Sequence, residues 1–180
     1  MALVLRLFAV FVLGFSAANA QHASPYIDLQ TRAIKALSDQ QISDLRAGRG
    51  MGLALAAELN GYPGPLHVIE LASELGLSVE QRQRMEVMFT QMKAEASAIG
   101  EQLIAEESAL DRMFARKEID QQNLVVTTNK IGAIQAALRA SHLKYHLATV
   151  AVLEPEQVRK YAHLRGYHGA HPKMKHKHRH

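Results

Sequence analysis

Two pairs of side chains in this sequence have the spacing of metal ligands on helices. His142 and His146 are four positions apart, so on a helix both imidazoles project from one face. His67 and Glu70 are three positions apart in an earlier apolar segment and share a face in the same way. If the two helices pack side by side, these groups form a ligand set for a divalent transition metal such as Zn, Cu or Ni. The alternative is that all four are ordinary helix-flanking residues with access to solvent.

A second group of histidines lies at the carboxyl end of the chain. Residues 166–180 also contain four lysines or arginines and no acidic residue. Imidazoles at this density bind borderline divalent metals, weakly for each residue but usefully together. The alternative is a basic tail that is simply solvated. The five histidines are His168, His171, His176, His178 and His180.

Four methionines fall on the apolar stripe of the first of two long predicted helices. Core packing is the default interpretation, and an adaptable apolar surface that accepts varied clients is the alternative. A long, thin hairpin has little interior, so we expect part of the stripe to face a second subunit or a client. The candidate client-binding residues are Met85, Met88, Met92 and Met113.

The elements that must position these residues are two long helices, expected over residues 79–114 and 121–152. In the second, a seven-residue apolar repeat is typical of a seam along a partner helix. Strand signals are nearly missing. The sequence therefore predicts an all-α fold, an elongated antiparallel helical hairpin with short flanking helices, which pairs as a dimeric cradle. The seam residues are Leu124, Ile131, Leu138, Tyr145 and Val152.

Two similar five-residue boxes frame this hairpin, and each is typical of a helix start. They are Leu77-Ser78-Val79-Glu80-Gln81 and Leu153-Glu154-Pro155-Glu156-Gln157. A third version begins at Leu37, where Ser38 either caps a new helix or lies inside one expected over residues 31–47. Shorter helices are expected over residues 53–59, 66–75 (ended by Gly76) and 156–164.

Catalytic motifs are missing from the sequence, which contains no nucleophile elbow, no His-Glu-x-x-His and no dinucleotide fingerprint. We therefore expect no enzymatic activity and no organic cofactor. The glycine-rich stretch Gly48–Gly52 would suit a phosphate loop only after a strand, and a helix is expected there instead. A bend between helices is the favoured interpretation.

The amino terminus has the features of an export signal. An apolar run, too short to span a bilayer, is followed by Ala18 and Ala20 at the positions that a signal peptidase reads. No later segment is expected to span a membrane, and the chain contains no Cys. The 180 residues divide into a signal peptide (1–20), an N-terminal helical segment (21–65), a hairpin domain (66–165) and a His/Lys-rich tail (166–180). Because the basic excess lies in the tail, we do not expect nucleic acid as a partner.

The two boxes around an exported, Cys-free hairpin resemble the paired Leu-Thr-x-x-Gln motifs of the Spy/CpxP family of periplasmic proteins, a superfamily that includes ZraP- and CnrX-like heavy-metal proteins. The resemblance covers roughly residues 66–165. It implies a cradle-shaped homodimer, unfolded or stressed envelope proteins as clients, and a sensor kinase or an anti-sigma system as a candidate signalling partner. The sequence thus predicts a periplasmic, ATP-independent chaperone-like stress protein that also binds divalent metal. The alternative is a periplasmic heavy-metal sensor or metal-buffering resistance protein.

Overall fold

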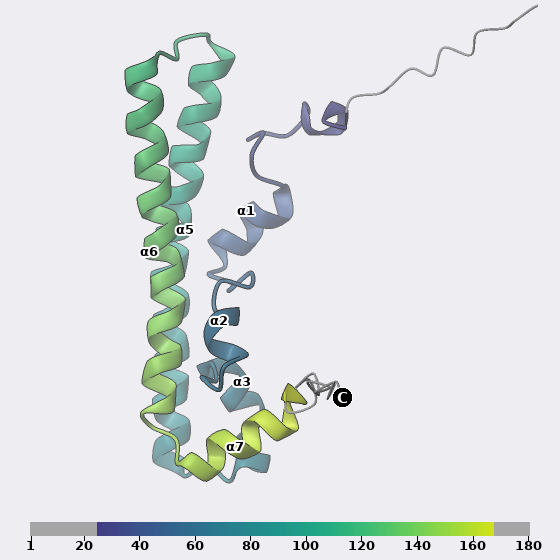
Figure 1. The fold of residues 1–180 in the computed structure, drawn as a ribbon, viewed down its shortest axis with the longest axis vertical. Helices are drawn as coiled ribbons and strands as arrows, with labels where there is room; N and C mark the ends of the chain where they lie inside the picture. Colours follow the sequence, from purple (N-terminus) through teal and green to yellow (C-terminus); the bar gives the residue numbers. More distant parts are fainter. Residues whose placement is uncertain (1–24, 168–180) are drawn as a thin grey trace, which may run out of the picture.

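Two long antiparallel helices packed side by side form the body of the molecule (Figure 1). The structure is a computed structural model and describes residues 25–167. Helix α5 spans Val79–Ala115 and helix α6 spans Gln121–Val150. With a rise of 1.5 Å per residue, α5 is about 55 Å long. The predicted all-α hairpin is confirmed, and the ends of both long helices lie within two residues of the predicted positions.

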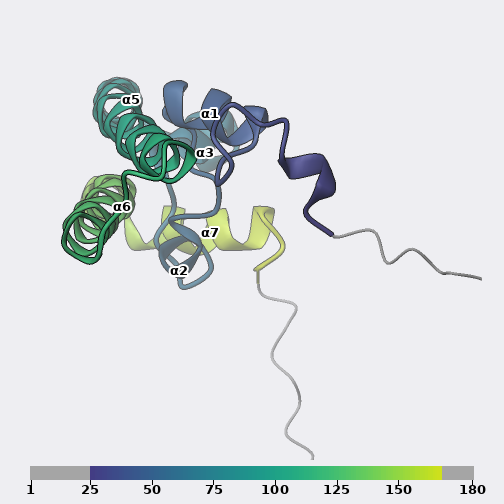
Figure 2. The same cartoon turned by 90° about the horizontal axis from the view of Figure 1, so that it is seen from above.

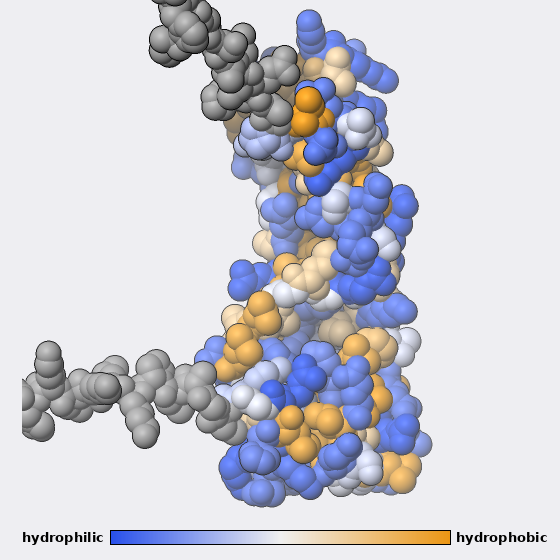
Figure 3. Space-filling view, turned by 90° about the vertical axis from the view of Figure 1, so that its right-hand side faces the viewer, coloured by the Kyte–Doolittle hydropathy of each residue, from blue (hydrophilic) through white to orange (hydrophobic). Residues whose placement is uncertain are grey.

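The short helices lie along one side of this hairpin, as the view from above shows (Figure 2). Helices α1 and α3 pack on α5, and α7 crosses the base of the hairpin beside α4. On the face that carries the short helices, apolar side chains lie in separate patches between polar ones (Figure 3). The short elements are a 3-10 turn at Ile27–Leu29, α1 at Asp39–Arg46, α2 at Leu55–Glu58, α3 at Pro65–Glu70, α4 at Ala72–Leu75 and α7 at Pro155–Leu164.

Both long helices begin with a side-chain cap that explains where they start. At α5, the Ser78 hydroxyl accepts the Gln81 backbone N–H at 3.1 Å, and the Gln81 side chain accepts the Ser78 N–H at 3.0 Å. At α6, Asp120 and Asn123 make the same two bonds at 2.8 and 2.9 Å. Such reciprocal caps satisfy backbone donors that a helix start otherwise leaves unpaired. The cap residues therefore fix both starts locally.

The two sequence boxes meet at the base of the hairpin, although 76 positions separate their glutamines. The Gln81 amide donates to Gln157 Oε1 at 2.9 Å, and the Gln157 amide donates to Gln81 Oε1 at 3.0 Å. The Gln81 amide also donates to the Val152 carbonyl at 3.0 Å. Each glutamine side chain thus caps its own helix and binds the other helix, so α5 and α7 are joined at their first turns.

Two of the predicted helices are shorter or broken in the structure. The helix expected over residues 31–47 begins only at Asp39, because Ser38 is extended (φ −76°, ψ 159°) and caps α1 with Gln41. This settles the role of Ser38 as a helix start. The helix expected over residues 66–75 is interrupted at Leu71, which leaves the helical region (φ −106°, ψ 18°) between α3 and α4. Gly76 ends α4 in the left-handed region, as predicted.

The core consists of two buried clusters. One joins the N-terminal segment to the hairpin and contains Leu45, Ala96, Leu103 and the seam residues Ile131 and Leu138. The other lies at the base and joins α3, α4, α5 and α7; it is formed by Val68, Leu75, Met85, Leu153 and Tyr161. Among the described residues, no helix combines the length and apolar character that crossing a membrane requires.

Two glycines allow the N-terminal segment to lie directly against α5. A Cβ on Gly100, in the middle of α5, would stand 2.5 Å from the Leu45 carbonyl oxygen. A Cβ on Gly48 would stand 2.4 Å from the Lys93 carbonyl oxygen, and Gly48 has a positive φ of 63°. Ser97 supports the same contact by donating to the Arg46 carbonyl at 2.6 Å. Backbone therefore packs on backbone here, which positions the Gly48–Gly52 loop beside α5.

Candidate functional site

A cavity of about 530 Å³ lies between the N-terminal segment and the two long helices. The Gly48–Gly52 loop, α2 and the start of α3 form one wall, while α5 and α6 form the other. Most of the lining is apolar, and its polar side chains are Arg49, Glu58, His67, Lys93, His142 and His146. The cavity has the size of small-molecule sites in proteins, which span about 300–1,000 Å³.

Three of the four residues predicted to form an internal metal site line this cavity. His142 and His146 are buried on α6, with His142 only 2% exposed, and His67 reaches the cavity from α3. Glu70 is exposed and is not part of the lining. Among the described residues, no three His, Asp or Glu side chains are placed so that they could hold one metal ion together. The structure thus brings the three imidazoles to one cavity and leaves Glu70 outside it.

The carboxylate that does reach the cavity is Glu58, which sequence reasoning missed. It is only 6% exposed, and its Oε1 accepts the hydroxyl hydrogens of Tyr161 and, at 2.8 Å, Tyr167. Its Oε2 accepts the Gly64 N–H at 3.2 Å. Three nitrogens lie near the carboxylate: His67 Nδ1 is 3.4 Å from Oε1, His146 Nδ1 is 3.8 Å from Oε2, and Arg165 Nε is 4.0 Å from Oε1. Glu58 therefore joins α2 to α3 and α7 through one buried charge.

The contacts of Glu58 keep it ionised. Burial alone would raise the pKa of this carboxyl, but the contacts with His67, Tyr161 and Tyr167 outweigh burial and lower the pKa to about 2. The pKa of Tyr161 is instead raised, first by burial and then by the adjacent Glu58 carboxylate. At neutral pH this buried negative charge thus accepts hydrogen bonds from the hydroxyls of Tyr161 and Tyr167.

The two histidines on α6 have different surroundings. His146 Nδ1 lies 2.6 Å from the Tyr62 carbonyl oxygen, so Nδ1 carries the proton that this bond requires. Neither ring nitrogen of His142 makes a hydrogen bond with a described residue, and its Nε2 is fully buried. Burial and, to a smaller extent, His146 lower the pKa of His142, which favours its neutral form. His142 is therefore a buried polar group with unused hydrogen-bonding capacity.

One sequence signal could have found Glu58. Between Arg49 and His67 it is the only charged residue, and it sits in the apolar stretch Leu53–Leu59. A single carboxylate in a short apolar helix indicates burial with dedicated partners, because an unpaired buried charge is costly. Its main partners, Tyr161 and Tyr167, lie more than 100 positions later, so their identity required the fold.

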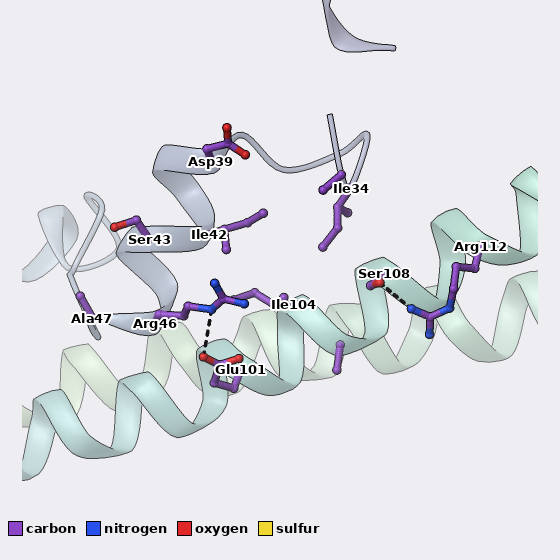
Figure 4. A pocket seen from close by; sticks show the side chains of 12 residues that line it. Ile34, Asp39, Ile42, Ser43, Arg46, Ala47, Glu101, Ile104, Ser108 and Arg112 are labelled. Atoms are coloured by element: carbon purple, nitrogen blue, oxygen red, sulfur yellow. Dashed lines mark hydrogen bonds and ion pairs between the residues drawn. The ribbon is translucent and has the colours of Figure 1, made fainter. Parts of the chain in front are cut away.

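A larger groove of about 960 Å³ runs between α1 and α5 (Figure 4). Its charged side chains are largely paired with one another or with polar neighbours: Arg46 lies 3.2 Å from Glu101, and Arg112 donates to Ser108 at 2.6 Å. The groove therefore offers less unused chemistry than the histidine-lined cavity, despite its size.

A third surface is an open apolar groove of about 610 Å³ between α5 and α6 near the base. Val87, Met88, Ala148, Ala151 and Val152 form its apolar part, with Glu80, Gln83 and Arg84 at its edge. Val87 is 55% exposed, and Leu147, next to the groove residue Ala148, is 60% exposed. The lining residues form the apolar groove of the hairpin.

The predicted client-binding methionines separate into two groups. Met85 and Met92 are buried, and Met85 belongs to the core cluster at the base, so within the described chain both are core residues. Met88 is half-buried and lines the apolar groove of the hairpin, while Met113 is half-buried near the hairpin tip. Core packing thus accounts for two of the four, and only Met88 and Met113 offer any surface.

Several predicted features lie outside the described residues. These are the signal peptide at residues 1–20 and the metal-ligand candidates His168, His171, His176, His178 and His180.

Comparisons with models of known protein families, with curated proteins and with solved structures find no match to this chain. The resemblance to the Spy/CpxP family therefore rests on the sequence features described above and stays a prediction.

Proposed function

We propose that this chain is an exported, non-enzymatic, chaperone-like protein that binds unfolded proteins along its helical hairpin. The observation that carries the proposal is the apolar groove of the hairpin. Val87 exposes a large aliphatic side chain there on α5, and Leu147, which precedes the groove residue Ala148, is exposed on α6. Contiguous exposed apolar surface of this kind is typical of interaction sites.

The character of the groove favours unfolded clients over one folded partner. Its apolar groups are Val, Met, Ala and Leu side chains, which make non-directional contacts and tolerate varied apolar groups in a client. The charged side chains at its edge, Glu80 and Arg84, are exposed and of opposite sign, so they select no client by net charge. In this proposal two copies pair as a cradle and present their grooves together, as the family resemblance implies.

The test is suppression of aggregation of reduced α-lactalbumin by the wild-type chain and by the Val87→Ser/Leu147→Ser double variant. Both side chains are exposed, so we expect the variant to fold normally. The lost aliphatic contacts are worth about 1.5 kcal/mol together, so we expect roughly tenfold weaker client binding. The matched control is Val125→Ser/Val126→Ser, which changes two exposed aliphatic residues at the start of α6. Wild-type suppression by the groove variant, or equal loss in the control, would contradict the proposal.

Metal binding by the histidines is the second part of the proposal and is tested separately. Titration calorimetry with Zn²⁺ compares the full chain with a chain that ends at Tyr167, which removes the five tail histidines. Ending the chain at Tyr167 keeps the hydrogen bond from its hydroxyl to Glu58. We expect binding by the full chain and its loss in the shorter one, because Glu58 and His146 Nδ1 already use their hydrogen-bonding positions internally. Equal binding by both chains would place the metal at the internal histidines instead.

A further inference from the structure

The wall of the histidine-lined cavity beside the Gly48–Gly52 loop carries unused hydrogen-bond donors. The backbone amides of Gly50, Met51 and Gly52 make no hydrogen bond with any described residue. All three residues line the cavity, and Met51 and Gly52 hold positive φ angles of 44° and 80°. Consecutive free amides in such conformations favour a negatively charged partner.

His142 lies at the same wall. A Cβ on Gly50 would be 3.8 Å from His142 Nδ1, so the loop backbone and the imidazole are neighbours. His142 is 2% exposed and makes no hydrogen bond with a described residue. A buried polar side chain without a partner is destabilising unless something else satisfies it. With the proton on Nδ1, the ring supplies a further N–H at this wall.

Lys93 supplies the net charge of the lining. Its ammonium has no ion pair among the described residues, whereas Arg49 is paired with Asp44 at 2.5 Å. The negative charge of Glu58, which also belongs to the lining, is already shared with Tyr161, Tyr167 and the nearby Arg165. One unpaired cation therefore remains, on a lining residue whose backbone lies against Gly48, next to the free donors.

The rest of the cavity is apolar. Leu55, Leu66, Phe89 and Met92 contribute side chains from α2, α3 and α5. The cavity thus has a donor-rich end with one net positive charge and a hydrocarbon-lined body. Those two properties match a molecule with one anionic, acceptor-rich head and an aliphatic chain.

We propose that this cavity binds an amphipathic carboxylate, such as a fatty acid of medium chain length. The carboxylate accepts hydrogen bonds from the amides of Gly50–Gly52 and from His142 while pairing with Lys93. The aliphatic chain lies among the apolar side chains. Donors complement a carboxylate, whereas no three His, Asp or Glu side chains among the described residues are placed to hold one metal ion. This inference concerns a different surface from the apolar groove of the hairpin.

The test is calorimetric titration of the full chain with dodecanoate below its micelle concentration. We expect saturable binding, and about tenfold weaker binding by Lys93→Gln, because one charge-assisted contact is lost. Lys160→Gln is the matched control, since Lys160 is also exposed but lies on α7, outside the cavity lining. Dodecyltrimethylammonium, with the same chain and the opposite charge, should not compete.

Three results would overturn the proposal. Lys93→Gln binding dodecanoate like the wild type would remove the role of the cation. Equal binding of the cationic amphiphile would show that only the apolar chain is recognised. Loss of binding in Val87→Ser/Leu147→Ser would move the site to the apolar groove of the hairpin. Failure of the aggregation assay leaves all three readouts unaffected, so the two proposals fail independently.

Discussion

Replacing Glu58 with Gln is expected to lower the free energy of unfolding at pH 7 by roughly 3 kcal/mol. The carboxylate is buried and accepts hydrogen bonds from Tyr161, Tyr167 and the Gly64 amide. A glutamine keeps the shape but has one oxygen instead of two and presents an NH₂ group toward these donors. It also removes the negative charge beside Arg165. The loss is therefore larger than that of one ordinary hydrogen bond.

Urea unfolding followed by circular dichroism measures this difference. Glu70→Gln is the matched control, because Glu70 is an exposed carboxylate on the adjacent helix α3. Substitutions at such exposed positions usually change stability by no more than about 0.5 kcal/mol. If Glu58→Gln lowered the free energy of unfolding as little as Glu70→Gln does, the hydrogen bonds of Glu58 would not hold α2 against α7.

The same carboxylate makes stability depend on pH with a defined sign. The pKa of Glu58 is about 2 in the folded chain, against an ordinary value of 4.5. Its contribution is therefore complete above about pH 4.5 and is lost progressively as the pH falls toward 2. The variant Glu58→Gln lacks this titration. We expect the stability difference between wild type and variant to shrink over this range, and a constant difference would contradict the assignment.

Alanine at Gly100 and alanine at Gly132 are expected to change stability in opposite directions. Both glycines lie inside long helices, where alanine is normally favoured by about 1 kcal/mol. At Gly132 nothing lies within 4 Å of the added Cβ, so we expect this gain in full. At Gly100 the Cβ would stand 2.5 Å from the Leu45 carbonyl oxygen, and α1 must move away. We expect a net loss of roughly 2 kcal/mol there.

Thermal unfolding of the two variants decides between helix propensity and packing. A gain in both would mean that α1 is not held against α5 in solution. Hydrogen exchange provides a second readout, since Gly100→Ala should reduce protection in α1 while leaving the base of the hairpin unchanged. The Gly132→Ala variant should leave both regions as protected as in the wild type.

The long helices could be predicted because their determinants are local. Ser78 with Gln81 marks the start of α5 within five residues of sequence, and the seven-residue repeat in α6 specifies which face meets its partner. The breaks at Ser38 and Leu71 were harder, since an apolar helical pattern continues through both positions. At Ser38 the cap competes with continuation of the helix, and the sequence alone does not decide between them.

The candidate site was only partly predictable, because it depends on contacts between distant segments. His142 and His146 follow from helical spacing, whereas the partner carboxylate was expected at Glu70 and is Glu58 instead. Spacing shows which residues share a face of one helix, but not which loop covers that face. The Gly48–Gly52 loop covers it, because the backbone at Gly48 packs directly on the backbone at Lys93. A sequence pattern of side chains does not predict a contact of this kind.

The glutamine pair at the base of the hairpin has a consequence for how the molecule opens. Because the amides of Gln81 and Gln157 bind each other as well as their own helix starts, the first turn of α5 cannot fray without releasing α7. The base is then a single cooperative unit, whereas the tip of the hairpin, within residues 25–167, has no such reciprocal pair of side chains joining two helices. Opening should proceed from the tip inward, with the two boxes as the last elements to separate.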